Sequence, residues 1–186
     1  MVKRKKSEGK IKHTRTTIDG ITFDSKLEAQ YYEYLKNEKK AGRVKDFELQ
    51  PQFILQPKFF VWEGESITEE HPRYKEYNKK RLAYNKTVED DSLKIKIIQG
   101  IKYIADFTVT YSNGIVETID TKGIKTADFK IKEKTMKFLY PNINLICINY
   151  DKPTGEWLEY SKWKKLQNQR KAERNAKKKK ATKKEK

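Results

Sequence analysis

The stretch that most constrains the fold covers residues 104–123 and reads IADFTVTYSNGIVETIDTKG. Apolar residues alternate on both sides of an Asn-Gly pair, which is typical of a β-hairpin. Three charged residues, Asp106, Asp120 and Lys122, stand near the ends of the two arms. Charges are unusual on strands flanked by Ile, Phe and Val, so these three positions require an explanation.

The length of the hairpin loop decides whether the charges meet. A loop of two residues would place Phe107 opposite Asp120 and send Asp106 and Asp120 to opposite faces of the sheet. A loop of three residues, 112–114, with its glycine in the left-handed conformation, places Phe107 opposite Ile119. Phe against Ile is the better cross-strand pair. The apolar pattern therefore predicts the three-residue loop, in which Asp106 lies opposite Asp120.

Two carboxylates side by side repel each other, and a cation between them would remove the repulsion. Paired hard oxygen ligands suit Mg²⁺ or Mn²⁺. Lys122 has the same parity as Asp120, so its ammonium group is expected in the same pocket. Such a set can orient a water molecule and stabilise the charge of a phosphodiester transition state. The alternative is a surface hairpin whose charges contact only solvent.

The tripeptide Asp/Glu-x-Lys carries little weight by itself in a chain this rich in both charges. It also occurs at four other places, which are Glu8–Lys10, Asp24–Lys26, Glu38–Lys40 and Asp128–Lys130. The occurrence at Asp120–Lys122 differs because it ends a strong strand with another acid opposite.

The region before the hairpin predicts a helix. Residues 21–42 place Leu and Tyr at helical spacing, and Gly42 is suited to the C-terminal end. Ser25 followed by Glu28 has the form of a capping box. Glu28 therefore has two possible roles, as the capping partner of Ser25 or as a further acid of the metal site.

The remaining elements predict an α/β chain of the mixed α+β kind, with the order α-β-β-β-α-β and a central mixed sheet flanked by helices. We expect a basic tail at 1–16, one domain at 17–160 and a lysine-rich helical or disordered tail at 161–186. Before the hairpin we expect an extended segment at 44–55 interrupted by Pro51 and an insertion at about 56–98 that has no core of its own and ends in a short strand at 93–98. After the hairpin we expect a helix at 126–141 and a buried strand at 142–150. The apolar side of this helix is predicted to carry Phe129, Met136, Phe138, Leu139 and Tyr140.

The formal net charge of +17 is confined to the two ends of the chain. Residues 1–16 have a net charge of +6, residues 162–186 have +11, and the body between them is neutral. Basic ends of this kind favour a polyanion such as nucleic acid, because each neutralised phosphate releases counterions. The alternative is a pair of solvated tails that maintain solubility. The candidate DNA-binding residues are Lys3, Arg4, Lys5, Lys6, Lys164, Lys165, Arg170 and Lys171.

Other site classes find no support in the sequence. Cys147 is the only cysteine, so no intrachain disulfide forms, and His13 and His71 are too isolated to build a zinc cluster. The basic N-terminus lacks a following apolar run, and no stretch is long and apolar enough to span a membrane. These features predict a cytoplasmic protein with no membrane partner and no nucleotide cofactor.

The pattern resembles the PD-(D/E)XK nuclease superfamily. The phrases FDSKLEAQYYEYL, FELQPQF, YIADFTVTYSNG and IDTKG are similar, in this order, to a phage-encoded family within it that is associated with Holliday-junction resolution. The resemblance covers about 20–150, apart from the insertion at 56–98. It departs from the common pattern in having aspartate rather than glutamate at Asp120, and Ala105 where proline is usual.

The resemblance implies a restriction-endonuclease-like core and a Mg²⁺-dependent endonuclease that acts, as a homodimer, on four-way or otherwise branched DNA. It implies that Asp106 and Asp120 bind the metal ion with the backbone carbonyl of Thr121, and that Lys122 positions or activates a water molecule. Glu28 would be an auxiliary ligand or orient a metal-bound water. Gln50 and Lys132 are possible lining residues, although a strand-edge amide and a solvated helix lysine are the simpler interpretations.

Two alternative functions remain at this point. One is a site-specific or transposon-end-type DNA endonuclease, which would have the same core. The other is a non-catalytic DNA-binding protein whose lysine-rich ends hold the nucleic acid.

Overall fold

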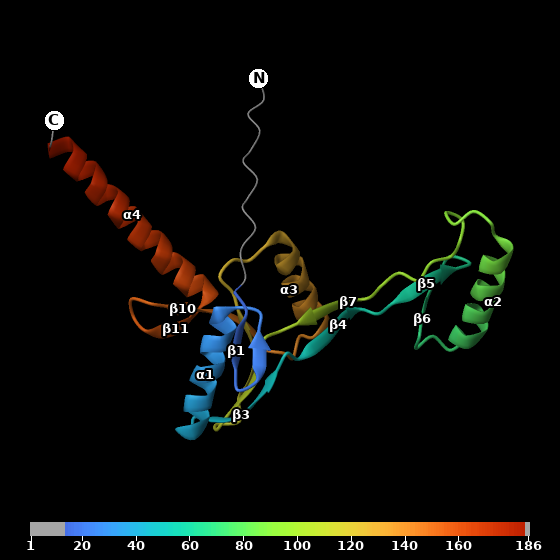
Figure 1. Ribbon diagram of the computed structural model, residues 1–186, viewed down its shortest axis with the longest axis horizontal. Helices are drawn as coiled ribbons and strands as arrows, with labels where there is room; N and C mark the ends of the chain where they lie inside the picture. The colour runs from blue at the N-terminus through green and yellow to red at the C-terminus, as the bar shows by residue number, and fades with distance from the viewer. Residues whose placement is uncertain (1–13, 185–186) are drawn as a thin grey trace. The chain divides into compact units, whose positions relative to one another are not determined.

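The computed structural model describes residues 14–184, with side chains described for residues 14–177. Contacts divide it into two compact units, and Figure 1 labels most of their elements. The first unit contains the chain as far as Leu49, together with Asp106–Lys125 and the chain from Asn144 onward. The second unit contains Gln50–Ala105 and Thr126–Ile143.

The first unit is built on a five-stranded sheet in the order β11-β10-β9-β8-β3. β9 and β10 are parallel, and the other neighbouring pairs are antiparallel, which confirms the predicted mixed sheet. The strands are β3 (Val44–Leu49), β8 (Phe107–Tyr111), β9 (Val116–Thr121), β10 (Leu145–Asp151) and β11 (Glu156–Glu159). Most of β10 is buried and it lies inside the sheet, as its nearly continuous apolar run predicts.

Helix α1 (Lys26–Lys40) packs on this sheet through the apolar positions that repeat at helical spacing. It begins directly after Ser25, where the capping box predicts its start, and the earlier part of the segment 21–42 forms β2 (Ile21–Phe23), which pairs with β1 (Thr16–Ile18) in a small hairpin. The helix ends before Gly42, which has φ +76°. Buried residues from α1, β2 and the sheet form one core, consisting of Phe23, Ala29, Tyr31, Tyr32, Leu35, Val44, Phe107, Val109, Ile119 and Ile148.

Helix α4 (Tyr160–Lys184) is anchored to the sheet by one buried carboxylate at the end of β10. Asp151 is 0% exposed and accepts two hydrogen bonds from the guanidinium of Arg170, at 2.5 and 2.9 Å. It also accepts from Gln167 Nε2 at 3.1 Å and from Thr154 Oγ1 at 3.0 Å. Figure 1 shows α4 in red, running away from β10 and β11. The lysine-rich segment predicted as a helical or disordered tail at 161–186 thus lies in α4 as far as Lys184, and contacts assign it to the first unit.

The second unit contains two strand pairs and two helices. β4 (Gln52–Gln56) pairs with β7 (Ile101–Ile104), β5 (Phe59–Trp62) pairs with β6 (Glu65–Thr68), and the helices are α2 (Tyr74–Thr87) and α3 (Ala127–Leu139). The insertion has a small core after all, because Phe60, Ile67 and Tyr77 pack together at under 9% exposure. The predicted strand at 93–98 is wrong, since Ile98 makes only an isolated bridge to Phe59.

Helix α3 begins at Ala127, one residue after the predicted start at 126, and Thr126 is its N-cap. The Thr126 hydroxyl accepts a hydrogen bond from the Phe129 N–H at 3.2 Å. Phe129 and Met136 are buried as predicted. Phe138 is 83% exposed, so its predicted place on the buried side is wrong. It lies two residues after Met136, which puts it on another side of a helix with 3.6 residues per turn. Among residues 14–184 no helix has the length and apolar character needed to cross a membrane.

The predicted order α-β-β-β-α-β corresponds to α1, β3, β8, β9, α3 and β10. The other elements are additions before, within and after this series. Pro51 predicts either an edge strand or two short pieces at 44–55, and the segment forms two strands, β3 and β4, on either side of this proline. Proline cannot donate a ladder hydrogen bond, and this limits its place in a continuous strand.

Candidate active site

The hairpin of β8 and β9 has the register that the apolar pattern predicts. Phe107 pairs with Ile119 and Thr110 with Val116, and the Tyr111 N–H donates to the Ile115 carbonyl at 2.8 Å. The loop therefore consists of residues 112–114, and Gly114 has the left-handed φ of +86°. A three-residue loop is confirmed.

The ladder ends one pair earlier than predicted. The backbone N–H of Asp106 donates to the Ile119 carbonyl at 3.1 Å, and Asp106 and Asp120 are not ladder partners. The Asp106 carboxylate instead accepts hydrogen bonds from the Thr121 N–H at 2.6 Å and from the Thr121 hydroxyl at 2.8 Å. The Thr121 N–H lies beyond the last ladder pair of β8 and β9, so the β8 backbone offers it no carbonyl acceptor. The Asp106 carboxylate accepts its hydrogen bond instead.

Asp120 and Lys122 form an ion pair at the end of β9. The side chain of Asp120 is 1% exposed and that of Lys122 is 26% exposed. The lysine backbone is fixed on both sides, since its N–H donates to the Ile148 carbonyl at 2.9 Å and its carbonyl accepts from Asn149 Nδ2 at 2.7 Å. The end of β9 thus holds a lysine in a defined place beside a buried carboxylate.

Glu28 reaches the same place from the first turn of α1. The Ser25 hydroxyl accepts from the Glu28 N–H at 3.2 Å and donates to the Glu28 carboxylate at 2.7 Å, so Ser25 is the N-cap as predicted. Burial raises the pKa of Glu28, the charge of Asp106 raises it further, and Lys122 opposes both. The Glu28 carboxylate thus accepts a hydrogen bond from the N-cap residue and also interacts electrostatically with Asp106 and Lys122. The two roles considered for Glu28 are therefore compatible.

The electrostatics of the other groups centre on the Lys122 ammonium. Burial alone lowers the pKa of Lys122, but Asp120, Asp106 and Glu28 together raise it above its usual value. Burial raises the pKa of Asp106, while Lys122 and the hydrogen bonds from Thr121 oppose this shift. Glu28, Asp106, Asp120 and Lys122 are from here on called the acid–lysine cluster.

The composition of the acid–lysine cluster fits a hard divalent cation. Three carboxylates face one ammonium group, an excess of two negative charges when all four groups are ionised. Mg²⁺ is commonly held by one or two carboxylates, with waters and substrate phosphates completing its coordination. Among the described residues no group of three or more Asp, Glu, His or Cys side chains is arranged so that it could hold a metal ion. The binding of Mg²⁺ by Asp106, Asp120 and the Thr121 carbonyl therefore stays a prediction, in which waters and substrate phosphates would complete the coordination.

Two neighbours of the cluster were not among the predicted residues. Asp24 raises the pKa of Asp106 by its charge, so it lies within electrostatic range. Asp24 directly precedes the N-cap Ser25 in the sequence, and this position could have indicated that it lies near the cluster. Asn149 fixes the Lys122 carbonyl. Its signal was an amide that directly follows the apolar run LICI.

The remaining predicted residues belong to other parts of the chain. Gln50 and Lys132 belong to the second unit, where Lys132 makes an i,i+4 ion pair with Asp128 at 3.5 Å, and their place in the site stays a prediction. Lys3, Arg4, Lys5 and Lys6 are outside the described residues. On α4, Lys164, Lys165 and Lys171 are exposed, whereas the Arg170 guanidinium is committed to Asp151.

Comparison with known proteins gives a family but no activity. Residues 8–153 match the family described as protein of unknown function DUF1064. No curated protein and no solved structure matches the chain. Since the match covers most of its length, the chain belongs to the DUF1064 family.

Proposed function

We propose that the protein is a metal-dependent endonuclease that hydrolyses phosphodiesters in branched DNA. The observation that carries the proposal is the ion pair between the buried Asp120 and Lys122 at the end of β9, with Asp106 bound to the adjoining Thr121 and Glu28 within electrostatic range of Lys122. Carboxylates that can share a divalent ion beside a fixed lysine are the groups that phosphodiester hydrolysis requires.

Each residue of the acid–lysine cluster has a proposed task. Asp106 and Asp120, with the Thr121 carbonyl, would hold Mg²⁺ or Mn²⁺. The bound ion supplies Lewis acidity at the phosphate oxygens and lowers the pKa of a bound water. Lys122 would position or activate the attacking water, and Glu28 would be an auxiliary ligand or orient a metal-bound water. Thr121 fixes the Asp106 carboxylate by two hydrogen bonds, which limits the rotation of this ligand.

The charge distribution supports nucleic acid as the substrate. The body of the chain is neutral and both ends are strongly basic, so the ends can hold phosphates without reading bases. Branched DNA, a homodimer that makes two symmetric cuts, and action in the cytoplasm of a host cell are proposals that rest on the resemblance to phage junction-resolving enzymes.

The proposal is tested with a four-way junction and a linear duplex of the same sequence, each incubated with the purified protein and Mg²⁺. We expect the junction to be cut and the duplex to be cut much more slowly, with no cleavage after chelation by EDTA. Equal cleavage of both substrates would favour a site-specific or transposon-end-type nuclease. Folded protein that cuts neither substrate, in Mg²⁺ or Mn²⁺, would contradict the enzyme and leave a basic DNA-binding protein.

A further inference from the structure

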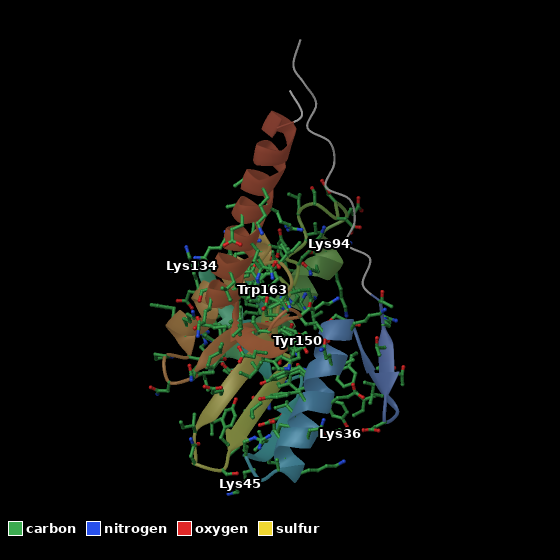
Figure 2. The ribbon with its side chains drawn as sticks, turned by 90° about the vertical axis from the view of Figure 1, so that its left-hand side faces the viewer. Lys36, Lys45, Lys94, Lys134, Tyr150 and Trp163 are labelled. Carbon is green, nitrogen blue, oxygen red and sulfur yellow. The ribbon has the colours of Figure 1, made fainter. Side chains whose placement is uncertain are left out.

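The first turn of α4 carries two aromatic side chains outside the acid–lysine cluster. The rings of Tyr160 and Trp163 have centroids 5.6 Å apart and are tilted by 41°. Both side chains are partly buried, so each ring packs on the protein and leaves part of its surface accessible. Figure 2 labels Trp163 on this helix. Residues Tyr160 and Trp163 are called the aromatic pair below.

A lysine lies over each ring of the aromatic pair. The Lys125 ammonium is 5.3 Å from the centre of the Tyr160 ring, and the Lys164 ammonium is 5.9 Å from the centre of the Trp163 ring. Both distances are within the range of cation–π contacts. Sites that bind single-stranded nucleic acid combine the same two components, since bases stack on aromatic rings and neighbouring phosphates contact cations.

The aromatic pair is connected to the acid–lysine cluster through Lys125, which contacts Tyr160 and is close to Lys122 along the chain. The Lys125 backbone N–H donates a hydrogen bond to the Tyr160 hydroxyl oxygen, with 3.4 Å between the two heavy atoms. Lys125 follows Lys122 by three residues, which span at most about 11 Å when extended. The aromatic pair therefore lies within the reach of a few nucleotides from Lys122.

From this arrangement we propose that Tyr160 and Trp163 stack an unpaired nucleic-acid base, while Lys125 and Lys164 contact the adjoining phosphates. The inference rests on the proposed function and adds a reason for its substrate preference. Bases in a continuous duplex are stacked on each other, whereas a base next to a branch point can leave the stack at lower cost. A stacking site beside the acid–lysine cluster would thus favour branched or single-stranded substrates over linear duplex.

Two other uses of these residues make different predictions. The rings could serve only to pack α4 on the sheet, in which case their loss would lower stability and weaken every ligand alike. The lysines could serve only as charges for any polyanion, in which case the rings would not matter. The test must therefore separate the contribution of the base from the contribution of the phosphate.

The test compares binding of a short oligo(dT) with binding of a fully abasic oligomer of the same length and charge. Binding is measured by fluorescence anisotropy in EDTA, so that no cleavage occurs. The wild-type protein should bind oligo(dT) more tightly than the abasic oligomer. Trp163→Leu should weaken oligo(dT) binding by about 5- to 150-fold, the range for loss of one stacked base, and leave abasic binding unchanged. Trp163→Phe should retain most of the preference.

Trp157 provides the matched control. It is also a partly buried tryptophan of the first unit, but it packs against Tyr31, Tyr34 and Tyr150. Trp157→Leu should lower stability while the ratio of the two affinities stays that of the wild type. An unchanged ratio in Trp163→Leu, or an equal fall for both oligomers, would overturn the proposal.

Photocrosslinking of the unmodified chain checks the inference without any variant. An oligonucleotide that contains 5-bromodeoxyuridine should crosslink to Tyr160 or Trp163, with the site identified by mass spectrometry. Crosslinks confined to other residues would contradict the stacking site. Because both measurements are made in EDTA, a failure of cleavage affects the proposed function and leaves this result unaltered.

Discussion

At the scale of single residues, Ser25 and Glu28 show how one local interaction can serve both folding and a site. The Ser25 hydroxyl caps α1 and also donates to the Glu28 carboxylate, which interacts electrostatically with Asp106 and Lys122. The sequence motif predicts the cap because Ser and Glu three residues apart satisfy N-terminal N–H groups. It does not predict which way the carboxylate points, since that depends on strands more than 70 residues later.

The first prediction separates the two roles of Glu28. Ser25→Ala removes the cap and should lower the free energy of unfolding by about 1 kcal/mol. Glu28→Gln keeps the size of the side chain, so it should cost less stability but lower the rate of junction cleavage. Urea denaturation and single-turnover cleavage measure the two effects. Full cleavage activity in Glu28→Gln with only a reduced melting temperature would leave Glu28 as a capping residue alone.

At the scale of secondary-structure elements, the β8–β9 hairpin was the most predictable part of the site. Its register follows from apolar pairing, because a shift by one residue would bring Phe107 against Asp120. The departure at Asp106 was not predictable from that pattern. It arises because the Thr121 N–H and hydroxyl both bind the Asp106 carboxylate, and this draws the strand end out of the ladder.

The second prediction concerns the loop that sets this register. Gly114 has φ +86°, a conformation that costs other L-residues roughly 1–2 kcal/mol, so Gly114→Ala should destabilise the protein by about that amount. Gly123→Ala is the matched control, because Gly123 has an ordinary φ and nothing lies within 4 Å of an added Cβ. Thermal unfolding should show a clear fall for the first variant and little change for the second. Equal melting temperatures would contradict the three-residue loop.

The anchoring of α4 was not predictable, because it depends on a contact between Asp151 and a helix that reads as a solvated tail. A run of lysine with few apolar residues gives no signal for docking. The signal lies instead in Gln167 and Arg170, which are three residues apart and therefore on one side of the helix.

The third prediction is the pH dependence of this anchor. The Arg170 guanidinium lowers the pKa of Asp151, so the ion pair contributes stability above the unfolded-state pKa of about 3.9 and loses it as the pH falls through the lower folded-state pKa. Asp151→Asn should therefore be less stable than wild type at neutral pH, with a difference in melting temperature that narrows in acid. Asp46→Asn, which removes an exposed ion pair to Lys39, should have little effect at either pH. A difference for Asp151→Asn that stays constant with pH would contradict the ionised anchor.

At the scale of the whole molecule, the excess positive charge and the acid–lysine cluster belong to different parts of the sequence. The acid–lysine cluster lies in the neutral body, while the excess of positive charge lies at the ends. The sequence predicts this separation by counting alone, and it also predicts the mixed sheet from the order of elements. It does not predict the additional strands and helix of the second unit, because short strands and an almost wholly polar helix lack a distinct periodic signal.

The fourth prediction assigns nonspecific DNA affinity to the C-terminal lysines. Deletion of residues 171–186 leaves the Asp151–Arg170 anchor in place and removes nine basic residues and two acidic ones. Duplex binding should weaken and depend less steeply on salt, because fewer counterions are released. Cleavage of bound junction should continue at the wild-type rate. A salt dependence identical to that of the full chain would show that these lysines do not contact DNA.

The central claim is that the acid–lysine cluster is a metal-dependent nuclease site. The most direct test measures single-turnover cleavage of a four-way junction in Mg²⁺ and compares the variants Asp120→Asn and Asp128→Asn. Both substitutions remove the acid of an Asp-x-Lys tripeptide, but only Asp120 is paired with Lys122. Asp120→Asn should lower the cleavage rate by at least about 100-fold while junction binding in EDTA stays near that of the wild type. Asp128→Asn should cut at the wild-type rate. Folded Asp120→Asn protein that cuts as fast as Asp128→Asn would contradict the account.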